Sequence, residues 1–210
     1  MYKKGRTSTG RNPPQLKLQF PYRIKKTIAM KKLIFLLLIT FALNGCDNNN
    51  DKPKTELEKL PLATQTGANT AGCLVNGMAF LPKGNFPTLI CNYNDGANFS
   101  LFIKERIIQG SNENIRTINV FSYNQNLHDN VGVAFPLTVY GSNSKSGEYI
   151  TYNTDLGEIH YVTNSEVTGE LKITYHNYNQ AIISGTFWFD AINSTGQKVE
   201  VRNGRFDMHY

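Results

Sequence analysis

From residue 71 to the end, the chain consists of short runs rich in Val, Ile, Thr, Tyr and Phe, interrupted by Gly, Asn and Asp about every ten residues. Such spacing of strand-forming residues and turn residues is typical of an all-β sandwich or barrel. No long stretch repeats with the period of a helix. We therefore expect residues 71–210 to form one all-β domain, a single antiparallel sandwich or barrel of about 8–11 short strands.

Turn residues locate the joints between the candidate strands. Asn94-Asp95-Gly96-Ala97 predicts a tight hairpin, because glycine adopts positive φ without steric cost. Asn203-Gly204 is compatible with a second hairpin or with a bulge inside one long final strand. The candidate strands are residues 73–80, 88–93, 99–105, 115–123, 133–140, 149–152, 159–163, 171–178, 182–190, 199–202 and 205–210.

An apolar run at residues 33–43, LIFLLLITFAL, is too short to span a bilayer and has the length of a signal-peptide core. Met30-Lys31-Lys32 precedes it and Asn-Gly-Cys46 follows, which is the pattern of a bacterial lipobox. We expect residues 1–29 to be a non-native upstream extension and residues 30–45 to be a lipoprotein signal peptide. Cys46 would then carry the lipid that binds the membrane.

Residues 46–70 are predicted to be the lipidated cysteine and a flexible tether. They are polar, contain two prolines and show no sustained periodicity. A short helix at residues 55–60 is an alternative for part of this segment.

The charge of the chain is divided unevenly. The chain has 22 Lys and Arg against 16 Asp and Glu, but ten of the basic residues and none of the acidic ones precede Cys46. The predicted mature chain therefore has 12 basic and 16 acidic residues, a net charge of about −4. This removes the argument for a nucleic-acid partner, which requires a basic surface.

Two cysteines, Cys73 and Cys91, remain after the predicted leader. In an exported protein an even pair of cysteines predicts a disulfide, which would contribute about 3 kcal/mol by the chain-entropy argument. The alternatives are two free thiols, as in a reducing compartment, or a zinc site. Zinc would need further ligands at metal spacing, and none lies near the two cysteines.

Motifs for catalysis are missing. The chain has no Gly-x-Ser-x-Gly elbow, His-Glu-x-x-His helix, phosphate loop or Gly-x-Gly-x-x-Gly turn. The histidines His128, His160, His176 and His209 are isolated, and no two are spaced to lie side by side on one strand face. We predict no catalytic residue, no metal and no cofactor. Convergence of His160, His176 and nearby carboxylates in one cleft would instead favour an enzyme.

Three aromatic residues form a candidate ligand surface. Trp188 alternates with Phe187 and Phe189 in a candidate strand, so it either packs in the core of a two-layer fold or lines a pocket. Tyr175 and Tyr178 lie among asparagines, and polar aromatic surfaces of this kind can stack on sugars or other ring faces. AT-rich codon usage is the simpler explanation for that composition.

Three segments together resemble a known family. LPLATQTGANTAGCLVNG at residues 60–77, ISGTF at residues 183–187 and NGRFD at residues 203–207 resemble lipoproteins of unknown function common in Bacteroidetes-type bacteria. The likeness spans residues 60–210; Ala71 departs from it, because an aromatic residue is expected before Gly72-Cys73. The resemblance implies a β fold and an outer-membrane lipid anchor, and it provides no activity or catalytic residue.

Two classes of function fit these features. The first is a non-catalytic binding module, tethered by lipid in the cell envelope and facing either the periplasm or the exterior. Its partner would be a small ligand, a glycan or an envelope protein. The second is a structural component that docks onto an outer-membrane complex through a strand edge or an apolar patch. A hydrolase has the least support, because the catalytic motifs are missing.

Overall fold

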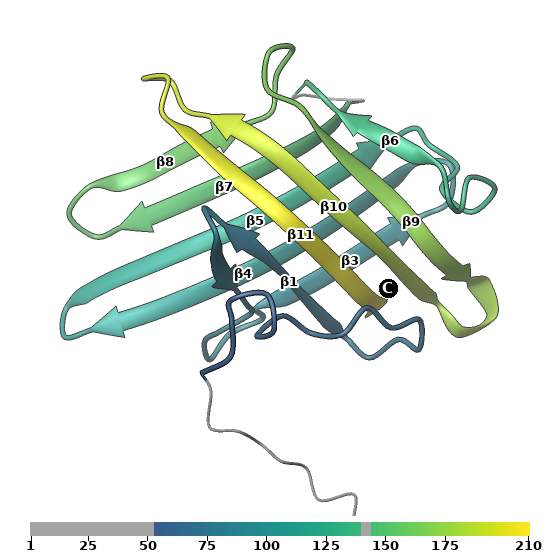
Figure 1. Cartoon of the computed structure of the whole chain (residues 1–210), viewed down its shortest axis with the longest axis horizontal. Helices are drawn as coiled ribbons and strands as arrows, with labels where there is room; N and C mark the ends of the chain where they lie inside the picture. Colours follow the sequence, from purple (N-terminus) through teal and green to yellow (C-terminus); the bar gives the residue numbers. More distant parts are fainter. Residues whose placement is uncertain (1–52, 140–143) are drawn as a thin grey trace, which may run out of the picture. The chain divides into compact units, whose positions relative to one another are not determined.

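The computed structural model describes residues 53–139 and 144–210, which fold into one antiparallel β-sheet (Figure 1). The predicted all-β class is confirmed, and within the described residues the only helical element is a 3-10 turn, η1 (Tyr178–Gln180). The predicted leader and Cys46 lie outside the described residues. The strands are β1 (Thr70–Val75), β2 (Met78–Phe80), β3 (Leu89–Asn94), β4 (Asn98–Gln109), β5 (Asn112–Tyr123), β6 (Ala134–Leu137), β7 (Lys145–Asn153), β8 (Gly157–Val162), β9 (Gly169–Asn177), β10 (Ile182–Ile192) and β11 (Lys198–His209).

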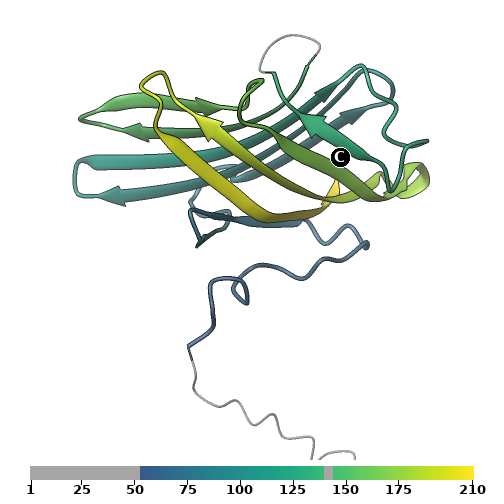
Figure 2. The same cartoon turned by 45° about the horizontal axis from the view of Figure 1, so that its top comes forward.

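Nine of the eleven strands follow the order β2-β1-β11-β10-β8-β7-β5-β4-β3, β9 and β6 lie off this path, and the sheet is not closed. One edge of strand β10 pairs with β11, and the other edge has two neighbours: β9 pairs with residues 182–189, and β8 pairs only at Ile192. Strand β6 pairs with the other side of β9. The sheet is strongly curved, as Figure 2 shows.

The curvature wraps the inner face of the sheet around one hydrophobic core. On β4, Phe99, Leu101 and Ile103 alternate into this core and are fully buried, as the two-residue period of a strand requires. The Phe99 ring meets Phe206 of β11, with ring centroids 5.5 Å apart. Strands distant in the sheet order therefore pack against each other across the core.

The structure decides between the alternatives left at the turns. The predicted hairpin between β3 and β4 is confirmed: the Ala97 amide donates to the Asn94 carbonyl at 3.0 Å, and Gly96 has a φ of 66°. At Asn203-Gly204 the chain does not turn back. Strand β11 continues through it, and its register with β10 shifts between Phe187 and Phe189. This site is therefore a bulge in one long strand.

The segment before β1, predicted to be a tether, contacts the folded domain. Glu58 accepts hydrogen bonds from the Thr55 amide at 2.7 Å and the Thr55 hydroxyl at 2.9 Å, which closes a capped turn at the position of the alternative short helix. Glu56 accepts from the Ala79 amide at 2.9 Å, and Leu60 is buried. The part of this segment that follows Thr55 is thus attached to the sheet.

Candidate functional site

A buried carboxylate, Asp207 of β11, fixes the segment that precedes β1. It accepts hydrogen bonds from the Thr64 hydroxyl at 2.6 Å and from three backbone amides, those of Thr66, Gly67 and Ala68, at 2.8–3.1 Å. The Ser184 hydroxyl of β10 donates to it at 2.8 Å. Burial alone would raise the pKa of Asp207, but these donors outweigh it and hold the pKa well below the usual 3.8.

This arrangement, which we call the Asp207 clasp, joins the three motifs that carried the family resemblance. The Thr-x-Thr-Gly-Ala part of the opening motif and Ser184 of ISGTF supply the donors, and the closing Gly-Arg-Phe-Asp supplies the acceptor. Gly67 has a φ of 71°, which lets its amide turn toward the carboxylate at no steric cost.

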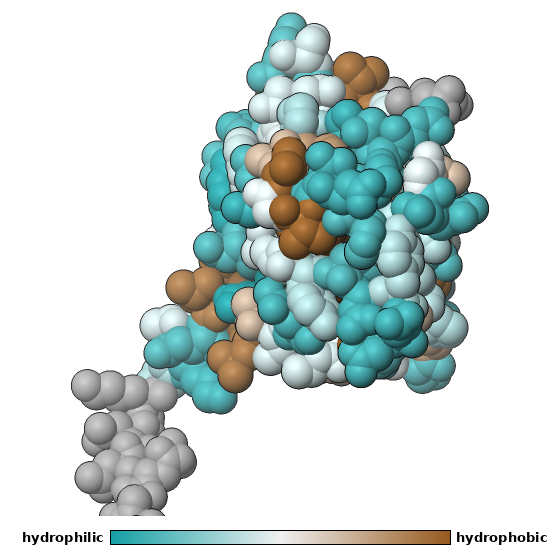
Figure 3. Space-filling model, turned by 90° about the vertical axis from the view of Figure 1, so that its right-hand side faces the viewer, coloured by the Kyte–Doolittle hydropathy of each residue, from teal (hydrophilic) through white to brown (hydrophobic). Residues whose placement is uncertain are grey.

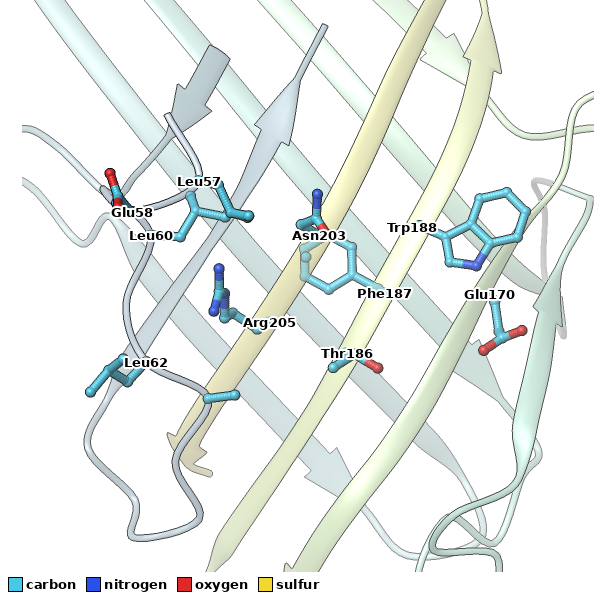
Figure 4. Close-up of a pocket in the computed structure, with 12 residues that line it drawn as sticks. Leu57, Glu58, Leu60, Leu62, Glu170, Thr186, Phe187, Trp188, Asn203 and Arg205 are labelled. Carbon is cyan, nitrogen blue, oxygen red and sulfur yellow. The ribbon is translucent and has the colours of Figure 1, made fainter. Parts of the chain in front are cut away.

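A groove of about 640 Å³ lies between the clasped segment and strands β9 to β11. Figure 4 shows Leu57, Leu60 and Leu62 of the segment on one side, Trp188 and Glu170 on the other, and Arg205 between them. The whole lining is Leu57, Glu58, Leu60, Leu62, Ala63, Glu170, Thr186, Phe187, Trp188, Asn203, Gly204 and Arg205. Both sides are therefore mainly apolar, with few charges.

Three side chains, Trp188, Leu62 and Arg205, give the groove its chemical character. Trp188 is 40 % exposed and Leu62 is 80 % exposed, so apolar surface is available inside an open groove. The guanidinium carbon of Arg202 lies over the Trp188 ring, 5.5 Å from its centre, which is a cation–π contact. The Nε atom of Arg205 is buried and has no hydrogen-bond partner among the described residues. The groove thus offers apolar contacts and one unused donor.

The other two predicted ligand-surface residues lie elsewhere. Tyr178 belongs to a cluster with Tyr93, His128, His176 and Tyr210, and its ring centroid lies 4.2 Å from that of His128 and 4.5 Å from that of His176. Tyr175 is partly buried and accepts a hydrogen bond from the Asn177 amide group at 3.1 Å. The structure therefore places Trp188 in the groove and Tyr178 in a separate aromatic cluster.

The cluster brings together two histidines that looked isolated in the sequence. His128 Nδ1 and His176 Nδ1 lie 3.1 Å apart, and His176 Nε2 lies 2.9 Å from the Tyr210 hydroxyl. Because one Nδ1 must donate and the other accept, at most one of the two imidazoles can be doubly protonated while this contact lasts. Burial, and then the neighbouring His128, lower the pKa of His176.

The condition that would have favoured an enzyme is not met. His160 lies 2.7 Å from Glu148 of β7 and 3.6 Å from Glu158 of β8. The hydrogen-bond partners of His176 are instead His128 and Tyr210, so the two histidines have different partners. Across residues 53–139 and 144–210, no group of three or more His, Cys, Asp or Glu side chains is placed to hold a metal ion.

A pH-dependent stability follows from His176. Its pKa is lower in the folded chain than the usual 6.5, so the unfolded chain takes up the proton first and stability falls as the pH drops below about 6.5. His160 has the opposite effect on the pH dependence of stability, because its hydrogen bond to Glu148 raises the pKa of His160. We expect the stability difference between wild type and His176→Gln to be smaller at pH 5.5 than at pH 7.5.

Urea unfolding of both proteins at the two pH values measures that difference. Comparing the two proteins cancels the contribution of His160, which both retain. A difference that is constant or larger at pH 5.5 would contradict a buried His176 that resists protonation.

The cysteines differ from the prediction. Cys73 and Cys91 are both buried free thiols, and the predicted disulfide is not present. Cys73 of β1 pairs with Phe80, whose ring lies under Arg116, while Cys91 of β3 pairs with Leu101 and lies near Tyr210. Burial raises the pKa of Cys91 to about 12 and raises that of Cys73 as well. Both thiols are therefore uncharged core residues with different neighbours.

Most strands around the groove belong to a stretch that resembles other proteins. Residues 105–208 match a family described as a domain of unknown function, DUF6252. The match agrees with the predicted resemblance to a family of unknown function. Comparison with curated proteins and with solved structures gives no significant match.

The DUF6252 match includes one side of the groove and leaves out the other. Glu170, Trp188, Arg205 and Asp207 lie within it, whereas the clasped segment at residues 57–68 precedes it. The groove therefore combines the matched region with a segment from outside it.

The exposed surface beyond the groove is mainly polar on the face shown in Figure 3, where apolar residues form only small separate patches. Among the described residues, no helix is both long enough and apolar enough to cross a membrane.

Proposed function

We propose that the protein is a lipid-anchored, non-catalytic binding module of the cell envelope. The observation that carries the proposal is the groove between the clasped segment and β9–β11, because it combines apolar sides, the exposed Trp188 and the unused Nε donor of Arg205. A concave, mostly apolar site with few polar groups is the usual form of a small-molecule site.

The lining indicates the chemistry of the ligand. An apolar chain between Leu62 and Trp188 would cover surface that now faces water. An acceptor at one end of the ligand would satisfy the Nε donor of Arg205, which otherwise stays buried without a partner. A small amphiphile with an acyl chain and a carboxylate meets both requirements.

Trp188 is the only tryptophan of the chain, so its fluorescence reports directly on the groove. We expect dodecanoate to shift the emission of Trp188 to shorter wavelength in a saturable titration. Dodecyltrimethylammonium has the same chain with the opposite charge, and we expect it to bind at least tenfold more weakly because Arg205 is cationic.

Two matched leucine variants test the place of binding. Leu62 and Leu156 are 80 % and 78 % exposed, but only Leu62 lines the groove. Leu62→Ser should weaken dodecanoate binding about tenfold, since it removes most of one leucine contact. Leu156→Ser should leave binding unchanged. Equal affinities in the two variants, or no emission shift with either probe, would overturn the amphiphile site.

The anchor is supported by the lipobox pattern at Cys46, which lies seven residues before the first described residue, Pro53. Incorporation of a labelled fatty acid in the native host tests it. Label should appear in the wild type and be lost in Cys46→Ser. Equal labelling of both proteins, or label in neither, would remove the membrane from the proposal.

A further inference from the structure

A second groove lies on the outer face of strands β4, β5, β7 and β8, on the side of the sheet opposite the core. The register places its residues side by side on one face: Phe102 pairs with Asn119, Lys104 with Thr117, and Tyr152 with Glu158. The groove has a volume of about 540 Å³, within the size range of small-molecule sites. Its full lining is Phe102, Lys104, Glu113, Ile115, Thr117, Asn119, Ile150, Tyr152 and Glu158.

Asn119 gives this groove an unsatisfied polar atom. Its side chain is only 4 % exposed, and its Nδ2 donates to Glu148 Oε2 at 2.8 Å. Its Oδ1 atom is buried and has no hydrogen-bond partner among the described residues. Buried acceptors are normally paired, so this atom is placed to accept a donor that the chain itself does not provide.

Glu148 holds Asn119 in this orientation. It is 3 % exposed and has two partners, the Nδ2 of Asn119 and the Nδ1 of His160 at 2.7 Å. An asparagine flip would turn Oδ1 toward the carboxylate and lose the Nδ2 bond. The free Oδ1 is therefore a consequence of the Glu148 contact.

The charges around the groove balance. Glu113 pairs with Arg106, and His160, when protonated, pairs with Glu148. Glu158 also lies 3.6 Å from His160, and Lys104 supplies the opposite charge beside it in the lining. A neutral ligand therefore fits better than a cation or an anion.

The remaining features specify the kind of neutral ligand. Lys104 provides donors, Asn119 Oδ1 and Glu158 provide acceptors, and the Tyr152 hydroxyl is both. Phe102 and Tyr152 add aromatic surface. Hydroxyl groups on a ring with an apolar face match this mixture, because each hydroxyl can donate and accept. We propose that this second groove binds a neutral sugar residue, with a sugar hydroxyl donating to Asn119 Oδ1.

The test uses the whole domain and named probes. Titrations followed by NMR with glucose, galactose, mannose and N-acetylglucosamine should show saturable shifts of the amides of β4, β5 and β7 with at least one sugar. Trp188 lies on β10, outside this groove, so its emission should not change. This readout separates the sugar site from the amphiphile site, and either can fail without the other.

Two asparagine variants locate the site. Asn119→Ala should weaken sugar binding at least tenfold, while Asn92→Ala, the same change at an exposed position of β3, should leave it unchanged. If Asn119→Ala fails to fold, Tyr152→Ala at a partly exposed lining position replaces it, with the same expected loss. Absence of saturable shifts with all four sugars, or equal affinity in the groove variant and Asn92→Ala, would overturn the proposal.

Discussion

Replacing Asp207 with asparagine is expected to lower the free energy of unfolding by about 3–4 kcal/mol and to release the segment that precedes β1. The carboxylate accepts from Thr64, Thr66, Gly67, Ala68 and Ser184, all of which are donors. An asparagine side chain has only one acceptor oxygen, and its NH2 group would point its own N–H donors at the donors that now bind the carboxylate. Several buried donors would lose their acceptor at once.

Urea unfolding measures this loss, and limited proteolysis detects the released segment. Asp155→Asn is the matched control, because Asp155 is exposed in the turn between β7 and β8. It should change stability by less than about 0.5 kcal/mol. Similar values for the two variants would mean that the clasp contributes little to the fold. Dodecanoate binding should also be lost in Asp207→Asn, since one side of the groove depends on the clasp.

A comparable loss of about 3 kcal/mol or more is expected for Gly169→Ala. Gly169 begins β9 and pairs with Phe189 of β10 and with Leu137 of β6. An alanine Cβ would lie 2.3 Å from the Trp188 carbonyl oxygen and 2.3 Å from the Phe189 Cβ. Backbone atoms cannot swing away as a flexible side-chain end can, so β9 must separate from β10.

Thermal unfolding followed by circular dichroism measures the effect. Gly110→Ala is the control: its φ of 64° costs about 1 kcal/mol for an alanine, but no atom lies within 4 Å of the added Cβ. If Gly169→Ala is no worse than Gly110→Ala, then the close approach of β9 and β10 is not rigid. Because Trp188 sits in this contact, its emission should also change in Gly169→Ala.

Strand positions could be predicted from the sequence because they depend on local chemistry. The candidate strands at residues 88–93 and 182–190 correspond to β3 and β10, and the Asp-Gly turn was recognised. The candidate at residues 73–80 was wrong in one respect: it contains a turn at Asn76-Gly77, where both residues have positive φ, and so it forms both β1 and β2. Asn-Gly is also a turn signal, like Asp-Gly, but the strand-forming runs on either side of Asn76-Gly77 are short.

Strands β4 and β5 are longer than predicted for a different reason. The ends of these strands carry charged residues, and in the sequence alone such residues are more typical of a loop than of a strand. In the sheet, Arg106 pairs with Glu113 and Arg116 with Glu105, so each charge lies beside its opposite on the neighbouring strand. Cross-strand pairing is visible only once the register is known.

The groove could not be predicted, because its two sides have no shared pattern in the sequence. Trp188 was identified as a candidate for lining a pocket, and it does line one. Leu57, Leu60 and Leu62 lie in a segment without periodicity. The clasp to Asp207, 143 residues after Thr64, and the hydrogen bond between Glu56 and Ala79 bring them to the sheet. The contact between His128 and His176 was missed for the same reason, since their 48-residue separation carries no local signal.

The Asp207 clasp also determines how the domain responds to mechanical load. A pull on the chain from its N-terminal side first reaches the bond between Glu56 and Ala79, and then the stretch with Leu57, Leu60 and Leu62. The load next reaches the clasp, where several hydrogen bonds to one carboxylate share the force before the force can reach β1. Tension would therefore peel the groove open while the sheet stays intact.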